Sequence, residues 1–132
     1  MTEDPLLALR TACAGLLFPS ESEFPLEVFA WKEQAGELNE RTLLSLAGRP
    51  ADAPVARGDV DGFFKNAVAE SDWNDEAERA VARRFQNLLQ VLKSSLAGVS
   101  VFRVGEIEID VYIVGRTPGG DWAGLRTKVI ET

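Results

Sequence analysis

The chain opens with apolar residues at three- and four-residue spacing, which predicts an amphipathic helix. Asp4 and Pro5 provide the expected start of this helix, because an aspartate caps the first N–H groups and the proline ring already has a helical φ. Gly15 lies close to its expected end. The apolar stripe consists of Leu6, Leu9, Cys13, Leu16 and Leu17.

A longer apolar stripe predicts a helix over about 74–96, and this stripe is wide enough to cover a sheet. Shorter helices are expected over 41–47, with Asn39 as the N-cap, and over 61–69. The stripe of the long helix consists of Ala77, Val81, Phe85, Leu88, Leu89, Leu92 and Leu96.

Alternating residues predict strands in the rest of the chain. Residues 26–33 alternate between an aliphatic face and a face that is too aromatic to be fully exposed. Residues 99–105 and 106–115 predict a tight hairpin, and 125–132 predict a last strand. Residues 48–58, which contain several Gly and Pro, are expected to connect two helices. Ile107, Ile109, Val111 and Ile113 are expected to face one way.

The order of these elements predicts an α+β fold, in which helices cover a mainly antiparallel sheet. The length of 132 residues fits a single domain over 1–132. We see no signal peptide and no apolar stretch near the roughly 20 residues that cross a bilayer. The single cysteine, Cys13, suits a reducing compartment, so we expect a soluble cytoplasmic protein that does not bind membranes.

Charge further limits the classes of partner. The chain has 21 acidic and 14 basic residues, and the net charge of −7 argues against direct binding to nucleic acid. Residues 1–78 contain 16 acidic and 6 basic residues, whereas 79–132 contain 5 and 8. This asymmetry indicates an acidic face for a basic partner, although many cytosolic proteins are merely acidic.

Catalysis has little support in the sequence. The chain has no histidine, which removes the most common general base and the usual serine or cysteine triads. Cys13 lies on an apolar stripe and is expected to be a buried thiol. Asp59 begins a DVDG stretch whose spacing does not fit a calcium loop. A pair of catalytic carboxylates among Glu21, Glu23 and Glu27 remains an open alternative.

Exposed acids recur in three places. Residues 18–25 read FPSESEFP, in which Phe18 and Phe24 are expected to pin a loop whose prolines reduce its freedom. Residues 70–78 read ESDWNDEAE and precede the long helix. The last strand reaches Glu131 and Thr132, where a fixed carboxylate and a hydroxyl could ligate a hard cation such as Mg²⁺ in another protein. The alternative is that the chain simply stops there.

Three stretches of the chain resemble the nuclease A inhibitor family. They are GLLFPSESEFPLEVFAW (15–31), Asp72-Trp73 and VFRVGEIEIDVYIVGRTPGGDWAGLRTKVIET (101–132). The resemblance implies a three-layer α/β/α sandwich related to the pathogenesis-related-protein fold. It also implies a small acidic bacterial protein that blocks a sugar-nonspecific, Mg²⁺-dependent ββα-metal endonuclease. Ser71 and Trp122 depart from the family pattern.

The resemblance also implies which residues meet the enzyme. Glu21, Asp72, Trp73 and Thr132 match the family residues that enter the nuclease active site, and the terminal threonine is the one that reaches its metal. We add the neighbouring acids, so the expected partner-binding set is Glu21, Glu23, Asp72, Trp73, Glu131 and Thr132. For Trp73, a core position at the start of the long helix remains the alternative.

The expected mechanism is mimicry of nucleic-acid phosphates by carboxylates, with no cofactor and no metal of the protein's own. We expect a monomer that forms a 1:1 complex with the endonuclease. One alternative is an acidic interaction module with a different basic or metal-bearing partner. Another is a hydrolase that uses Glu21 and Glu27, which would show turnover.

Overall fold

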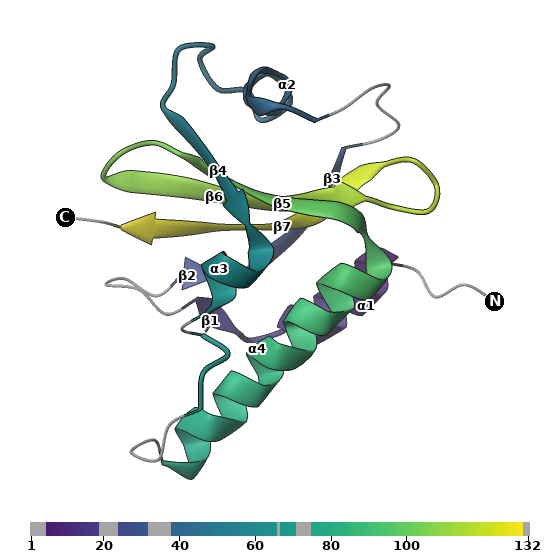
Figure 1. Ribbon diagram of the computed structural model, residues 1–132, viewed down its shortest axis with the longest axis vertical. Coiled ribbons are helices and arrows are strands. Elements are labelled where there is room, and N and C mark those ends of the chain that lie inside the picture. Colours follow the sequence, from purple (N-terminus) through teal and green to yellow (C-terminus); the bar gives the residue numbers. More distant parts are fainter. Residues whose placement is uncertain (1–4, 19–23, 32–37, 66, 71–74, 131–132) are drawn as a thin grey trace.

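A computed structural model describes residues 5–18, 24–31, 38–65, 67–70 and 75–130. These residues form a five-stranded antiparallel sheet, a separate two-stranded sheet and helices (Figure 1). The α+β class expected from the sequence is therefore confirmed.

The elements follow one another in the order helix, strands, helix, strand, two helices and three strands. They are α1 (Pro5–Cys13), β1 (Leu17–Phe18), β2 (Phe24–Pro25), β3 (Glu27–Trp31), α2 (Glu40–Leu46), β4 (Val55–Asp59), α3 (Val60–Phe64), α4 (Glu76–Ser95), β5 (Ala97–Val104), β6 (Glu108–Arg116) and β7 (Trp122–Ile130). The large sheet has the order β3-β7-β6-β5-β4, and β1 pairs with β2. The strand closest to the end of the chain thus lies between β3 and β6.

Two apolar clusters lie on opposite faces of this sheet. The first is packed beneath α1, α3 and α4, and its fully buried members include Leu9, Phe64, Leu88, Leu92, Val111, Ile113 and Leu125. The second is packed beneath α2 and contains Leu38, Leu43, Leu44, Phe102, Val104, Tyr112, Val114 and Trp122. Helices therefore lie on both faces of the sheet, in three layers (Figure 1).

The alternation predicted over 26–33 is confirmed for Val28, Phe29 and Trp31, whereas Ala30 is exposed and residues 32–33 lie outside the described residues. Val28 of β3 packs against the first cluster, and Phe29 and Trp31 pack against the second. The aromatic face is half-buried, as its composition predicts. Asn39 caps α2, because its side chain accepts a hydrogen bond from the Thr42 N–H at 2.9 Å.

Two predictions for the chain between α2 and α4 are wrong, one because it missed a strand and the other because it made a helix too long. The predicted loop over 48–58 contains β4, an edge strand that pairs with β5. Four of the five β4 residues are exposed, so the strand has no alternating burial for the sequence pattern to reveal. The helix predicted over 61–69 is shorter in the structure. It is the five-residue α3, which ends at Phe64 and has Val60 and Phe64 as its buried residues.

The apolar stripe of α4 begins later than predicted. Ala77 and Val81 are exposed, and Ala82 is the first buried residue of the helix. The first turns of α4 extend beyond the sheet, so they have no core to contact (Figure 1). Asp75 and Glu78 instead form a capping box that starts the helix.

Two further residues assigned to apolar faces are exposed. Ile107 is 64% exposed, because it lies in the turn between β5 and β6 and not within a strand. Leu17 is 45% exposed, because it follows the end of α1 and belongs to the short strand β1. Periodicity extended beyond the end of an element thus gives the wrong face for the next residue.

Gly124 of β7 allows a close approach of two strands, which predicts a stability effect. A Cβ at this position would lie 2.8 Å from the Ile113 carbonyl carbon and 3.0 Å from the Val114 Cα, where no flexible side chain can move away. Gly124→Ala is therefore expected to lower the free energy of unfolding by about 1–3 kcal/mol, measured by urea denaturation.

Gly58→Ala is the matched control, because a Cβ on this edge-strand residue would meet no atom within 4 Å. This control is expected to be neutral or to raise the free energy of unfolding by up to about 1 kcal/mol. Equal denaturation midpoints for the two variants would contradict the close approach at Gly124.

Candidate partner-binding surface

All six partner-binding residues predicted from the sequence lie outside the described residues. They are Glu21, Glu23, Asp72, Trp73, Glu131 and Thr132. The structure instead describes the residues on both sides of the 19–23 and 71–74 segments and the strand that precedes residues 131–132. These flanking residues define where each acidic segment joins the fold.

The two ends of the 19–23 segment are joined by a pair of short strands. β1 and β2 pair antiparallel, with Phe18 opposite Phe24 and Leu17 opposite Pro25. The Phe18 ring stacks on Phe63, with ring centroids 4.4 Å apart. It also meets Phe64 and Phe85 edge to face. Phe18 is 8% exposed, so the expectation that this residue pins the loop to the core is confirmed.

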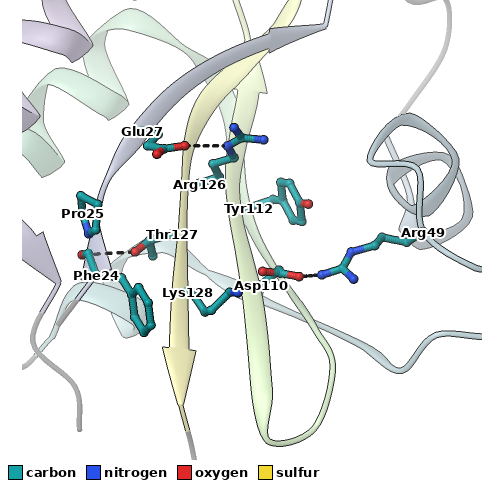
Figure 2. A pocket seen from close by; sticks show the side chains of 9 residues that line it. All are labelled: Phe24, Pro25, Glu27, Arg49, Asp110, Tyr112, Arg126, Thr127 and Lys128. Carbon is teal, nitrogen blue, oxygen red and sulfur yellow. Dashed lines mark hydrogen bonds and ion pairs between the residues drawn. The ribbon is translucent and has the colours of Figure 1, made fainter. Parts of the chain in front are cut away.

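Phe24 is held differently, by the strand that leads to the end of the chain. Its carbonyl oxygen accepts a hydrogen bond from the Thr127 hydroxyl at 3.5 Å, and the Lys128 Nζ lies 5.9 Å from its ring centroid (Figure 2). Thr127 and Lys128 belong to β7. The structure therefore brings together the base of the 19–23 segment and the last described strand before residues 131–132.

The residue that follows the 71–74 segment lies at the start of α4. Asp75 caps this helix, and Phe85, which contacts Phe18, lies ten residues later. Ten residues correspond to about 15 Å along a helix axis. The base of the 19–23 segment and the end of the 71–74 segment thus contact one helix at two well-separated levels.

A groove of about 330 Å³ lies beside the base of the 19–23 segment (Figure 2). Its lining comes from β2, β3, β6, β7 and the residue after Gly48, and consists of Phe24, Pro25, Glu27, Arg49, Asp110, Tyr112, Arg126, Thr127 and Lys128. The groove is thus continuous with the residues that hold Phe24.

Each cation of the groove is paired with a carboxylate from another element. Arg126 Nε lies 3.1 Å from Glu27 Oε2, and Lys128 Nζ lies 3.3 Å from Glu108 Oε1. Arg49, which follows α2, pairs with Asp110 of β6 and so links the α2 layer to the sheet. The groove therefore offers no unpaired cation for a phosphate backbone among the residues that line it.

The sequence did not predict this groove. Arg126 and Lys128 alternate along the last strand, which is a signal for one exposed face. Their partners, however, come from strands that are about 20 and 100 residues away in the chain. Only the order β3-β7-β6 brings them together. Ion pairs between strands that are distant in the chain leave no pattern in the nearby sequence from which they could be predicted.

The remaining candidates for chemistry have structural roles. Cys13 is 5% exposed, and burial raises the pKa of its thiol, so the reactive thiolate is disfavoured. Asp59 accepts a hydrogen bond from the Gly62 N–H at 3.0 Å and caps α3. Glu27, proposed for a carboxylate pair, is exposed and bound to Arg126. Within the described ranges, no three of the His, Cys, Asp and Glu residues cluster as metal ligands do.

Trp122, which departs from the family pattern, belongs to the second apolar cluster. It is 9% exposed, and the Arg116 guanidinium lies 4.3 Å from its ring centroid.

No helix in the described part of the chain has both the length and the apolar character that a bilayer span requires. Among the described polar residues, Asn39, Asp59 and Asp75 cap helices, and the charged residues of the groove form ion pairs between elements.

These features define an α+β protein in which anchored residues of the described fold flank the acidic segments. The model of the nuclease A inhibitor-like protein family matches residues 4–132, and the chain belongs to this family. Membership implies a nuclease-inhibitor role in general, and with it a nuclease as the partner of a binding protein. No curated protein matches the chain.

The anchoring of the 19–23 segment through Phe18 predicts an effect on stability. Phe18→Ala removes a buried ring that contacts three other aromatic rings, so the free energy of unfolding is expected to fall by about 3–5 kcal/mol in urea denaturation.

The adjacent residue provides the control. Leu17 is 45% exposed, so Leu17→Ala is expected to change the free energy of unfolding by less than about 1 kcal/mol. If both variants lose the same amount, the base of the segment is not held by the Phe18 ring.

Proposed function

We propose that this protein inhibits a sugar-nonspecific, Mg²⁺-dependent endonuclease of the ββα-metal class by blocking its active site. The observation that carries the proposal is the family match over nearly the whole chain. The adjacency of Phe24 and β7 supports it, because the residue that follows the 19–23 segment then bonds the strand that precedes residues 131–132.

The proposed mechanism follows from how a nonspecific nuclease holds its substrate. Such an enzyme binds the phosphate backbone through Arg, Lys and a metal ion, and it reads no bases. In the proposal, Glu21 bonds a basic side chain of the cleft, and Thr132 supplies oxygen ligands to the nuclease's Mg²⁺. Trp73 is the apolar anchor of the interface. Glu23, Asp72 and Glu131 add negative charge at the same surface.

The anchored flanks favour tight binding by this mechanism. A segment whose ends are already fixed loses less conformational entropy when the partner binds. The groove beside Phe24 supports the proposal as well, because its cations are neutralised by Glu27, Asp110 and Glu108 and would not repel a basic cleft.

The proposed complex contains one inhibitor and one nuclease, and the inhibitor needs no metal or cofactor of its own. It would act in the bacterial cytoplasm as protection against the nuclease. Adding the purified protein to a Mg²⁺-dependent ββα-metal nuclease assay tests the proposal. Unchanged hydrolysis of DNA and RNA at micromolar inhibitor would favour the alternative, a module for a different basic or metal-bearing partner.

Deletion of Thr132 is expected to raise the inhibition constant at least tenfold, because the proposed metal ligand is lost. The free energy of unfolding is expected to change by less than about 1 kcal/mol, since a terminal residue contributes few buried contacts. Inhibition is measured by fluorescent-substrate hydrolysis, and stability by urea denaturation.

Thr132→Ser is the matched control for this deletion. It retains both the hydroxyl and the terminal carboxylate, so its inhibition constant is expected to stay close to that of the wild type. Full inhibition by the deletion variant would rule out the proposed contact with the metal.

Trp73→Ala separates an interface role from a core role. As an interface anchor, Trp73 is expected to contribute at least about 2 kcal/mol, or roughly 30-fold in the inhibition constant, with little effect on unfolding. As a core residue it would instead lower the free energy of unfolding by about 3–5 kcal/mol. Inhibition within twofold of the wild type would remove Trp73 from the proposed interface.

A further inference from the structure

A polar network on α4 holds the chain just before the 71–74 segment. Arg83 Nε lies 3.1 Å from Glu70 Oε1, and Gln86 Nε2 lies 3.2 Å from Glu70 Oε2, so both carboxylate oxygens are bound. The same Gln86 nitrogen donates to the Val68 carbonyl oxygen at 2.8 Å. We call Glu70, Arg83 and Gln86 the α4 bracket.

The other end of the segment is fixed on the same helix. The Asp75 carboxylate accepts from the Glu78 N–H at 2.7 Å, and the Glu78 carboxylate accepts from the Asp75 N–H at 3.0 Å. Arg83 lies eight residues after Asp75, or about 12 Å along the helix axis. Because one rigid helix carries both anchors, the two ends of a four-residue segment are held at a fixed separation.

The bracket adds little to global stability. The side chains of Arg83 and Glu70 are 57% and 35% exposed, and exposed ion pairs typically contribute about 0–1 kcal/mol. A local effect is different, because fixing the ends of a short segment lowers the number of conformations open to it. The network is therefore better suited to restraining the chain than to stabilising the fold.

We propose that Glu70, Arg83 and Gln86 are positioning residues that restrain the segment containing Asp72 and Trp73 before the nuclease binds. This inference rests on the proposed function, in which Asp72 and Trp73 meet the nuclease. The first turns of α4 extend beyond the sheet and contact no apolar core (Figure 1). At this level of the helix, Glu70 is held by side-chain hydrogen bonds from Arg83 and Gln86.

The test compares variants of the bracket with a matched ion pair on the same helix. Glu70→Ala and Arg83→Ala are each expected to raise the inhibition constant of the intact protein, by about tenfold for Glu70→Ala. Arg83→Ala should add nothing in the Glu70→Ala background, because the two side chains act as one unit. Lys93→Ala is the control, since it removes another exposed ion pair, with Asp61, in the last turn of the same helix.

A second control accounts for the other partner of Arg83. Its Nη1 also lies 3.8 Å from Glu76 Oε1, so Glu76→Gln removes that contact and leaves the bracket in place. Inhibition by Glu76→Gln and by Lys93→Ala is expected to match that of the wild type. All variants should unfold within about 1 kcal/mol of the wild type.

Limited proteolysis gives a readout that needs no nuclease. Chymotrypsin cleaves after aromatic residues, and the bracket variants are expected to be cut after Trp73 at least threefold faster than the wild type and both controls. Mass spectrometry of the fragments identifies the cut. Proteolysis of this kind reports local opening when the global fold is intact.

The outcomes separate the inference from the proposed function. If the wild type inhibits the nuclease and the bracket variants inhibit equally well, the positioning role is wrong and the function stands. If the wild type does not inhibit, the proposed function is wrong. The rate of cleavage after Trp73 then still tests whether the α4 bracket restrains the segment. Faster cleavage of the bracket variants would support the restraint, and equal cleavage would overturn it.

Discussion

The pairing of β7 with both β3 and β6 is the constraint on which the arrangement of this protein depends. β7 is the last strand of the chain, yet it lies between β3, which follows the 19–23 segment, and β6. Residues that are about 100 positions apart thereby become neighbours, as in the pair of Glu27 with Arg126. The bond from Thr127 to Phe24 extends this contact beyond the start of β3, to β2. A glycine at position 124 makes the close approach of the strands possible.

The charges on this sheet are organised by the same pairing. Three cations of the groove bond carboxylates on other elements, so the described surface beside Phe24 is close to neutral. An inhibitor aimed at a basic cleft benefits from this neutrality, because an unpaired arginine at the rim would oppose association. The contribution of each exposed pair to stability is small. Their value in such a complex lies mainly in leaving the acidic segments without competing positive charge.

Local physics made much of the fold predictable from the sequence. Pro5, Asn39 and the alternation in β3 give local signals, and the structure follows them, with α1 beginning at Pro5 and Asn39 capping α2. β4 was missed because an exposed edge strand buries too little to alternate. Ala77 and Val81 were misassigned because helical periodicity does not reveal where the sheet beneath a helix ends. The groove depends on strand order, which is not a local property, whereas the acidic segments were found from their composition and from the family resemblance.

The residues that flank the 19–23 and 71–74 segments are held by different interactions, and the position of the sheet explains why. Phe18 lies over the first apolar cluster, so a buried ring can hold the 19–23 segment. The start of α4 lies beyond the sheet, where burial of a ring is not available, and Glu70 is held by exposed hydrogen bonds instead. Salt screens exposed charges far more than it affects an apolar contact. In the proposed complex, higher ionic strength would therefore weaken two interactions, the long-range attraction to a basic nuclease and the α4 bracket. The packing of the Phe18 ring would be unaffected.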